Sequence, residues 1–389
     1  MSVIQGSFDP RYEAVVEDLA GNIDAGTEIG ASIYIDLDGE PLVDVWGGWR
    51  DREHTTPWTQ DTIVNLWSTT KTVVSMAVLA LVDRGEIDVD APVSRYWPEF
   101  AQNGKENVLV RHLLGHTSGV SGWAQPFHNE DCYDLAASTA KLATQPPWWE
   151  PGTASAYHAS TYGHLNGELV RRVTGVTLGE FIRGEIAGPL GADFHLGLPD
   201  SEFGRVAPVY APVVADVDEA SLPKGDENAP DPDSVFAKTL SGSMADIDQA
   251  NTDDWRRAQI GGANGHGNAK SVAQILSAVT LDGVSNGVRL LSPPTIDQIF
   301  REQATNVDML LGIPLRWGIG FCLTPSSGVP FVRDGRVCFW GGWGGSMIVM
   351  DLDRRLTISY VMNQMQPGTI GSDVAAAYFD TIYRCFDAV

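Results

Sequence analysis

Leu-Trp-Ser-Thr-Thr-Lys at residues 66–71 runs directly into Thr-Val-Val-Ser-Met-Ala-Val-Leu-Ala-Leu-Val-Asp-Arg at residues 72–84. The second part is apolar on almost every side and is closed by Gly85, a pattern that predicts a buried central helix. Ser68 and Lys71 open this helix three positions apart, and residues at that spacing share one helix face within reach of each other. The stretch therefore predicts a serine beside a lysine at the start of a buried helix.

The Ser68–Lys71 pair has the spacing that an activated serine nucleophile needs. A lysine with an ordinary pKa of about 10.4 would be protonated at neutral pH and could not accept the serine proton. Burial and the positive end of the helix dipole both favour the neutral amine. The backbone N–H of Ser68, free at the helix start, could also help to hold an oxyanion. Because S-x-x-K alone recurs by chance, a helix cap followed by a surface lysine is the alternative at this point.

The charge of the chain disfavours two classes of partner. Lys and Arg number 26 against 50 Asp and Glu, and the net charge of −24 repels phosphate backbones and anionic lipid headgroups. No apolar run approaches the roughly 20 residues of a membrane-spanning helix, and the N-terminus lacks the pattern of a secretory signal peptide. We therefore expect a cytoplasmic protein without nucleic-acid or membrane partners. Its 389 residues suffice for one large core or two cooperating subdomains.

The residues that usually bind metals form no recognisable site. The four cysteines lie far apart without CxxC spacing, and we expect reduced, mostly buried thiols. They are Cys132, Cys322, Cys338 and Cys385. His112 and His116 have the spacing of a zinc-peptidase helix, but Leu113 stands where that chemistry needs a glutamate. We expect neither a metal nor a cofactor.

Elements at the two ends of the chain predict one sheet. Helical spacing at residues 11–22 precedes two alternating segments, 30–36 and 42–49, with the turn sequence Asp38-Gly39 between them. Strand-like segments and a final helix return near the other end of the chain, at residues 318–323, 329–339, 346–351, 356–363 and 373–386.

The segment between the two ends is mostly helical. Residues 162–174 and 178–186 are typical of helices that stop at Gly or Pro, and residues 207–233 are typical of a long Pro/Asp-rich surface loop. The simplest packing joins both chain ends in one sheet. We therefore predict an α+β fold, in which an antiparallel sheet is flanked by the N- and C-terminal helices. Its sheet subdomain comprises residues 1–85 and 265–389, its mostly helical subdomain residues 86–264, and the active site lies between them.

Four stretches carry a family resemblance. They are LWSTTK at 66–71, RGEIDVDAPVSRYWPEF at 84–100, VRHLLGHTSGV at 110–120 and PPWWEPGTASAYHASTYGHL at 146–165. In this order they resemble the superfamily of serine β-lactamases and penicillin-binding proteins, in which S-x-x-K is a recognised motif. Within it, the whole chain is most similar to the class C β-lactamase-like carboxylesterases of family VIII. The resemblance implies the β-lactamase/transpeptidase-like fold.

The second motif of that superfamily begins with a tyrosine whose hydroxyl points at the serine, and the resemblance places it at Tyr157. A phenol beside a lysine can carry the serine proton to the leaving group. Class C β-lactamases have Tyr-x-Asn, whereas Ala159 stands at the third position here, so the amide that would bind a β-lactam or a peptide is missing. Taken alone, Tyr157 could equally be a core aromatic residue.

The third motif of the superfamily, Lys/His-Thr/Ser-Gly, is replaced by Trp340-Gly341-Gly342. The change removes the cation that would hold the carboxylate of a penicillin or a peptide. The two glycines would let the strand approach the substrate closely, and by resemblance the backbone N–H of Trp343 is the second oxyanion donor. The alternative is a Gly-rich turn with buried tryptophans.

A second serine pattern, G-x-S-x-G at residues 283–287, does not predict a nucleophile. That motif needs a strand-turn-helix elbow, but residues 271–281 are helix-like and residues 288–294 end in Pro-Pro. We expect Ser285 to be a loop residue.

Together these features predict a serine carboxylesterase that hydrolyses small-molecule esters of short-chain or aromatic acids through a Ser68 acyl-enzyme, with Lys71 and Tyr157 as proton carriers. An apolar pocket would suit such substrates. Its expected lining residues are Trp123, Trp148, Trp149, Trp340, Gly341, Gly342 and Trp343. An acyltransferase, or an amide or β-lactam hydrolase of the same fold, is the first alternative. A sensor that is acylated without turnover is the second, and the intact Ser68, Lys71 and Tyr157 argue against it. The sequence leaves the oligomeric state open.

Overall fold

The computed structural model describes residues 3–213, 231–241 and 246–388 of the chain. Residues 214–230 of the predicted loop at 207–233 lie outside them. The strands are β1 Gln5–Phe8, β2 Gly30–Leu37, β3 Glu40–Gly48, β4 Ile63–Asn65, β5 Val206–Ala207, β6 His266–Gly267, β7 Val284–Ser285, β8 Val288–Arg289, β9 Ala304–Val307, β10 Pro314–Trp317, β11 Cys322–Leu323, β12 Val337–Gly341, β13 Met347–Asp351 and β14 Leu356–Met362. The α-helices are α1 Glu13–Asp24, α2 Thr70–Asp83, α3 Val110–Leu114, α4 Leu135–Thr144, α5 Thr161–Thr174, α6 Leu178–Phe181, α7 Gly188–Leu190, α8 Val235–Leu240, α9 Asp253–Arg257, α10 Ala269–Thr280, α11 Pro293–Ile299 and α12 Asp373–Asp387.

One large sheet contains strands from both ends of the chain. Within the described residues its order is β1-β3-β2-β14-β13-β12-β11-β10-β9. The two ends join where β14 pairs antiparallel with β2, from Leu356 opposite Leu37 to Met362 opposite Ala31. The neighbouring pairs in this sheet are antiparallel as well. This arrangement confirms the predicted α+β fold.

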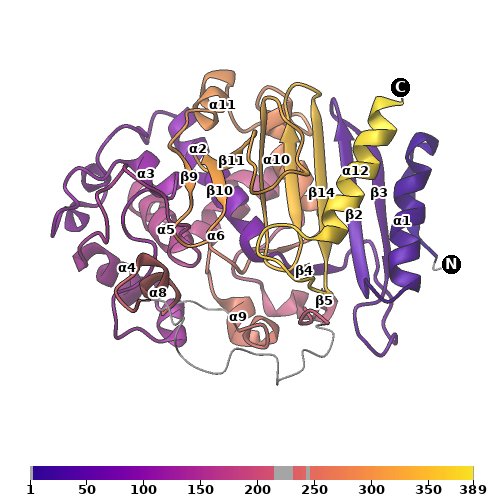
Figure 1. Ribbon diagram of the computed structural model, residues 1–389, viewed down its shortest axis with the longest axis horizontal. Coiled ribbons are helices and arrows are strands. Elements are labelled where there is room, and N and C mark those ends of the chain that lie inside the picture. Colours follow the sequence, from indigo (N-terminus) through magenta and orange to yellow (C-terminus); the bar gives the residue numbers. More distant parts are fainter. Residues whose placement is uncertain (1–2, 214–230, 242–245, 389) are drawn as a thin grey trace.

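Helices cover both faces of this sheet. In β14, Thr357 Oγ1 lies 2.9 Å from Thr280 Oγ1 of α10, whereas the ring of Tyr360 lies 5.1 Å from the ring of Tyr378 in α12. Because Thr357 and Tyr360 are an odd number of residues apart, their side chains point to opposite faces. The N-terminal α1 packs beside α12 and against β3, and Figure 1 shows these two helices next to each other with both chain ends nearby. The remaining helices lie mainly at the other end of the molecule, around α2 and α5.

The helix that carries the serine motif is as buried as its composition predicts. Helix α2 begins two residues earlier than expected and ends at Asp83, and twelve of its residues are buried. It packs against α5 and α10. A single 3-10 turn, Trp67–Thr69, precedes it, so Ser68 lies in that turn rather than in the α-helix itself.

The largest differences between the predicted and the observed boundaries occur at three places. The strand expected at 329–339 begins only at Val337, because Pro330 has no N–H to donate to a ladder and Gly335 adopts φ 145 in a turn. Of the strand expected at 318–323 only β11 forms. The helix expected at 178–186 opens into a π-helical turn at Ile182–Ala187 before α7.

Ser285 lies in a short hairpin rather than in the predicted loop. Strands β7 and β8 pair around Asn286 and Gly287, which adopt φ 46 and φ 76. Positive φ at both central residues is what a two-residue hairpin turn requires. The Ser285 hydroxyl is buried and donates to the Gln274 carbonyl at 2.6 Å. The serine of the G-x-S-x-G pattern therefore does not lie on an elbow.

Candidate active site

The strand–turn–helix around Ser68 presents its side chain to solvent. Strand β4 leads into the turn, and Ser68 is partly exposed between buried neighbours. Trp67 adopts φ 48, a left-handed backbone conformation that non-glycine residues rarely hold without support. Its ring packs against the rings of Trp255 and Trp343, with centroid distances of 5.8 and 5.1 Å. These contacts hold the strained residue directly before the serine.

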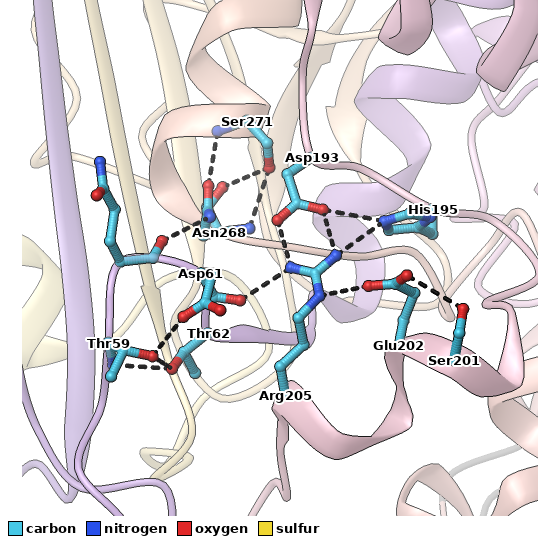
Figure 2. Close-up of polar contacts among 11 residues, drawn as sticks. Thr59, Asp61, Thr62, Asp193, His195, Ser201, Glu202, Arg205, Asn268 and Ser271 are labelled. Atoms are coloured by element: carbon cyan, nitrogen blue, oxygen red, sulfur yellow. Dashed lines mark hydrogen bonds and ion pairs between the residues drawn. The ribbon is translucent and has the colours of Figure 1, made fainter.

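An ion-pair network around Arg205 binds the residues just before strand β4 (Figure 2). The Arg205 guanidinium donates to Asp193 Oδ1 at 2.7 Å, to Glu202 Oε2 at 2.6 Å and to the Asp61 carbonyl at 2.8 Å. Asp61 precedes β4, and β5, which follows Arg205 directly, pairs parallel with β4. The network therefore holds β4, which leads to the serine turn, together with its neighbour β5.

Lys71 is placed as a base for Ser68. Its Nζ lies 3.0 Å from Ser68 Oγ, 2.7 Å from the Ala159 carbonyl and 2.6 Å from the Gly262 carbonyl. The side chain is 2% exposed, and this burial holds the pKa of Lys71 well below its usual value. A neutral amine has two N–H donors and one lone pair. Because two carbonyls accept both N–H groups, the lone pair is left for the Ser68 hydroxyl proton.

The two carbonyls that hold Lys71 were not predicted. In the sequence, Ala159 was notable only because it lacks the side-chain amide of class C β-lactamases, and no pattern pointed to Gly262. A Cβ on Gly262 would lie 2.9 Å from the Ser160 carbonyl oxygen and 3.0 Å from that of Ala159. Only glycine permits this close approach, so the Gly261-Gly262 pair was the available signal.

Tyr157 is a second buried group beside Ser68. It is 6% exposed, and its hydroxyl accepts a hydrogen bond from Trp340 Nε1 at 3.1 Å. Lys71 Nζ lies 4.7 Å from the centroid of the Tyr157 ring. Burial raises the pKa of Tyr157 above its usual value, and hydrogen bonds with Ser68 and Trp340 oppose that effect in part. The resting residue is therefore a neutral phenol whose oxygen already accepts from Trp340, which leaves its O–H to donate to Ser68.

Gly342, the second glycine after Trp340, permits a close contact within the protein. A Cβ on Gly342 would lie 2.4 Å from Ser346 Oγ and 2.5 Å from the Leu66 carbonyl oxygen. The glycine thus lets the end of β12 pack directly on the segment before Ser68, and the approach of this strand to a substrate stays a prediction. Among the described residues we find no acceptor for the backbone N–H of Trp343, which follows this contact.

Two of the tryptophans expected to line a pocket are buried in the core. Trp123 has no exposed surface, stacks on Phe127 at 4.2 Å and donates from Nε1 to the Ser138 carbonyl at 3.0 Å. Trp340 is 2% exposed and faces Tyr157. Neither presents a surface to a substrate, so the prediction was wrong for both as pocket walls. Trp148, Trp149 and Trp343 are partly exposed, and their contact with substrate stays a prediction.

The described residues contain no group of three or more His, Cys, Asp or Glu side chains placed to hold a metal ion. The two histidines with zinc-peptidase spacing instead accept backbone hydrogen bonds, His112 from Leu109 and His116 from His158. All four cysteines are free thiols, and three of them are buried. None of the helices that the structure describes has the length and apolar character of a membrane span.

Comparisons with known proteins agree with this geometry. The chain is 31% identical to the esterase/beta-lactamase LipL of Mycobacterium tuberculosis, over 95% of this chain and 85% of that protein. Among solved structures it is similar to a family VIII carboxylesterase, with 35% identity and a TM-score of 0.89 over 98% of this chain and 100% of that chain. A penicillin-binding protein homologue from Caulobacter crescentus shows 33% identity and a TM-score of 0.87 over the same shares of the two chains. The family model for beta-lactamase matches residues 18–381, and the chain therefore belongs to the beta-lactamase family.

Proposed function

We propose that this protein is a serine carboxylesterase that hydrolyses esters of short-chain or aromatic acids through a covalent acyl-enzyme on Ser68. The observation that carries the proposal is the 3.0 Å contact between Ser68 Oγ and a buried Lys71 amine whose other partners are two backbone carbonyls. The names of the esterase/beta-lactamase and of the family VIII carboxylesterase that this chain resembles support an ester as substrate.

In the acylation step, Lys71 Nζ takes the hydroxyl proton of Ser68 as Oγ attacks the carbonyl carbon of the ester. The developing oxyanion is held by the backbone N–H groups of Ser68 and Trp343. When the tetrahedral intermediate collapses, the bond to the alcohol oxygen breaks, and that oxygen takes the phenol proton of Tyr157. The alcohol then leaves. A proton passes from the Lys71 ammonium to the Tyr157 phenolate, which restores the neutral amine and the neutral phenol.

In the deacylation step, a water molecule attacks the acyl carbonyl and loses its proton to the Lys71–Tyr157 pair. Ser68 Oγ leaves as the ester bond to the enzyme breaks, and it takes that proton back. The same two residues thus act as base and then as acid in each half of the reaction. The chemistry proposed here uses only side chains and backbone amides.

The missing recognition groups favour esters over β-lactams. Trp340 stands where a cation would hold the carboxylate of a β-lactam, and its N–H is already committed to Tyr157. Ala159 contributes a carbonyl to Lys71 instead of a side-chain amide. We further propose a small-molecule substrate and a cytoplasmic site of action without nucleic-acid or membrane partners, because the net charge of −24 disfavours anionic polymers and lipid surfaces.

Labelling with a fluorophosphonate probe, followed by intact-mass measurement and peptide mapping, tests the proposal. We expect one adduct per chain, at Ser68, and hydrolysis of p-nitrophenyl butyrate by the unlabelled protein. Ser68→Ala should lose both, while Ser285→Ala, which changes a buried serine far along the chain, should keep both. Turnover that survives in Ser68→Ala would overturn the assignment.

A further inference from the structure

Asp308 is a buried carboxylate that none of the sequence patterns indicated. It follows β9 and has no exposed surface. Oδ1 accepts hydrogen bonds from the backbone N–H groups of Tyr157, Leu310 and Leu311, at 2.9, 3.0 and 3.1 Å. Oδ2 accepts from Ser155 Oγ at 2.9 Å and from Trp317 Nε1 at 3.3 Å. All five partners are uncharged donors, so the anion is held by dipoles.

The carboxylate binds the main-chain segment that carries Tyr157. Ser155 and Tyr157 both donate to it, and the Ser155 carbonyl accepts from the Met309 backbone N–H at 2.9 Å. The segment that carries the phenol is thus pinned to the loop between β9 and β10, about 150 residues away in sequence. A shift of that loop would move Tyr157 relative to Ser68.

The same carboxylate also binds a tryptophan that packs against the ring of Tyr157. Trp317, which donates to Oδ2, stacks parallel to the Tyr157 ring with a centroid distance of 6.1 Å and an interplanar angle of 4°. Its ring also lies 4.6 Å from that of Trp340, whose Nε1 donates to the Tyr157 hydroxyl. Asp308 therefore reaches the phenol by two routes, through its backbone and through the two indoles.

We propose that Asp308 is a positioning residue that fixes the Tyr157 hydroxyl against Ser68 and places a carboxylate charge beside this phenol. The inference rests on the proposed esterase function and assigns a residue to its proton path. A carboxylate buried without a cation is costly to maintain, and packing alone would not require one at this place. Precise placement of a proton donor would require such a group, because small misplacements lower rates strongly.

The electrostatic surroundings support the second half of this inference. Burial is the main reason why the pKa of Tyr157 is raised, and electrostatic interactions with the Tyr162 and Asp308 side chains raise it further. The other titratable groups beside the phenol are Lys71 of α2 and His116, with His158 next to His116. Burial lowers the pKa of His158 to about 4 and that of His116 below its usual value, so both rings are neutral near pH 7. Asp308 is then the fixed negative charge beside Tyr157.

The decisive variant is Asp308→Asn, which keeps the shape of the side chain but removes the charge and sets an NH2 group against at least two of the five donors. We expect kcat for p-nitrophenyl butyrate to fall on the order of tenfold or more with KM nearly unchanged. The rise of kcat with pH should move to lower pH by about half a unit, because removing a nearby negative charge favours both the phenolate and the neutral lysine. Rates are expressed per site titrated with the phosphonate probe, so misfolded protein does not enter them.

Asp351→Asn is the matched control. Asp351 is equally buried at the end of β13 and pairs with Arg354, away from the serine. It should lower thermal stability but leave kcat per titrated site and the pH profile unchanged. If Asp308→Asn behaves in the same way, Asp308 is only a structural residue and the inference is wrong.

Two milder variants cover the case in which Asp308→Asn does not fold. Trp317→Phe keeps a ring over Tyr157 without the N–H donor, and Ser155→Ala removes the other donor to the same carboxylate oxygen, Oδ2. Each should lower kcat per titrated site, and unchanged rates in both would overturn the inference. If the phosphonate probe does not label the wild-type protein and the protein hydrolyses no ester, the proposed function itself is wrong. If the wild-type protein is labelled and active but the variants keep its rate and pH profile, only the role of Asp308 is wrong.

Discussion

Replacing Tyr157 by phenylalanine removes one oxygen atom from the proposed proton path and leaves the ring in its stack. The loss of a positioned general acid typically lowers kcat on the order of a hundredfold or more, which corresponds to about 2.7 kcal/mol of transition-state stabilisation. The substitution also strips the buried Trp340 Nε1 of its acceptor, and an unsatisfied buried donor costs about 1–3 kcal/mol of folding stability. Activity and stability should therefore both fall, for separate reasons.

Tyr162→Phe separates the two effects. Tyr162 is another fully buried tyrosine, and its hydroxyl lies 2.8 Å from Ser75 Oγ, outside the proposed proton path. We expect this control to lose some stability in urea unfolding yet to keep near wild-type kcat. Steady-state rates with p-nitrophenyl butyrate, measured per titrated site, complete the comparison.

The reasoning also predicts that the Tyr157 and Lys71 substitutions are not additive. Residues that act as one proton-transfer unit cost nearly as much singly as together. The combination of Tyr157→Phe with Lys71→Met should thus be hardly slower than Lys71→Met alone. A Tyr157→Phe variant with near wild-type kcat would refute the proton role of the phenol and reduce it to a packing residue.

Two further predictions concern the strand beside the serine. The kcat/KM for nitrocefin should be well below that for p-nitrophenyl butyrate, because Trp340 and Ala159 replace the groups that hold a β-lactam; a larger value for nitrocefin would contradict this. Gly342→Ala would place a Cβ 2.5 Å from the Leu66 carbonyl oxygen, so thermal unfolding should show a loss of about 1–3 kcal/mol together with a lower kcat. Gly21→Ala, whose Cβ would meet no atom within 4 Å, should cost nothing, and equal effects at the two glycines would argue against the packing of β12 on the serine segment.

The sequence predicts most reliably what is encoded locally. Alternation in β2 and β3 and the two-residue turn at Asp38 and Gly39, both with positive φ, identify a hairpin without knowledge of its surroundings. The spacing of Ser68 and Lys71 likewise needs only helix geometry. Strand β10 begins with a proline and spans four residues, which is too short for a periodic signal, so it was missed.

The surroundings of Tyr157 could not be predicted for a different reason. Asp308 and Trp317 touch the Tyr157 segment from about 150 residues away, and a single aspartate or tryptophan carries no pattern that would pair it with a distant tyrosine. The family resemblance identified Tyr157 itself, but no sequence pattern indicated that Asp308 and Trp317 position it. Such contacts exist only once the two ends of the chain meet in one sheet.

The burial that makes Lys71 a base also works against the stability of the fold. A lysine whose pKa is lowered in the folded state binds fewer protons there than in the unfolded chain, so its contribution opposes folding below its usual pKa and fades as pH rises toward that value. The carbonyls of Ala159 and Gly262 offset part of this penalty by accepting the two N–H groups of the amine. Both carbonyls come from turns that glycine or a short side chain allows to approach α2. The site therefore uses backbone groups, which do not titrate, to hold an amine that must remain free to take and return a proton.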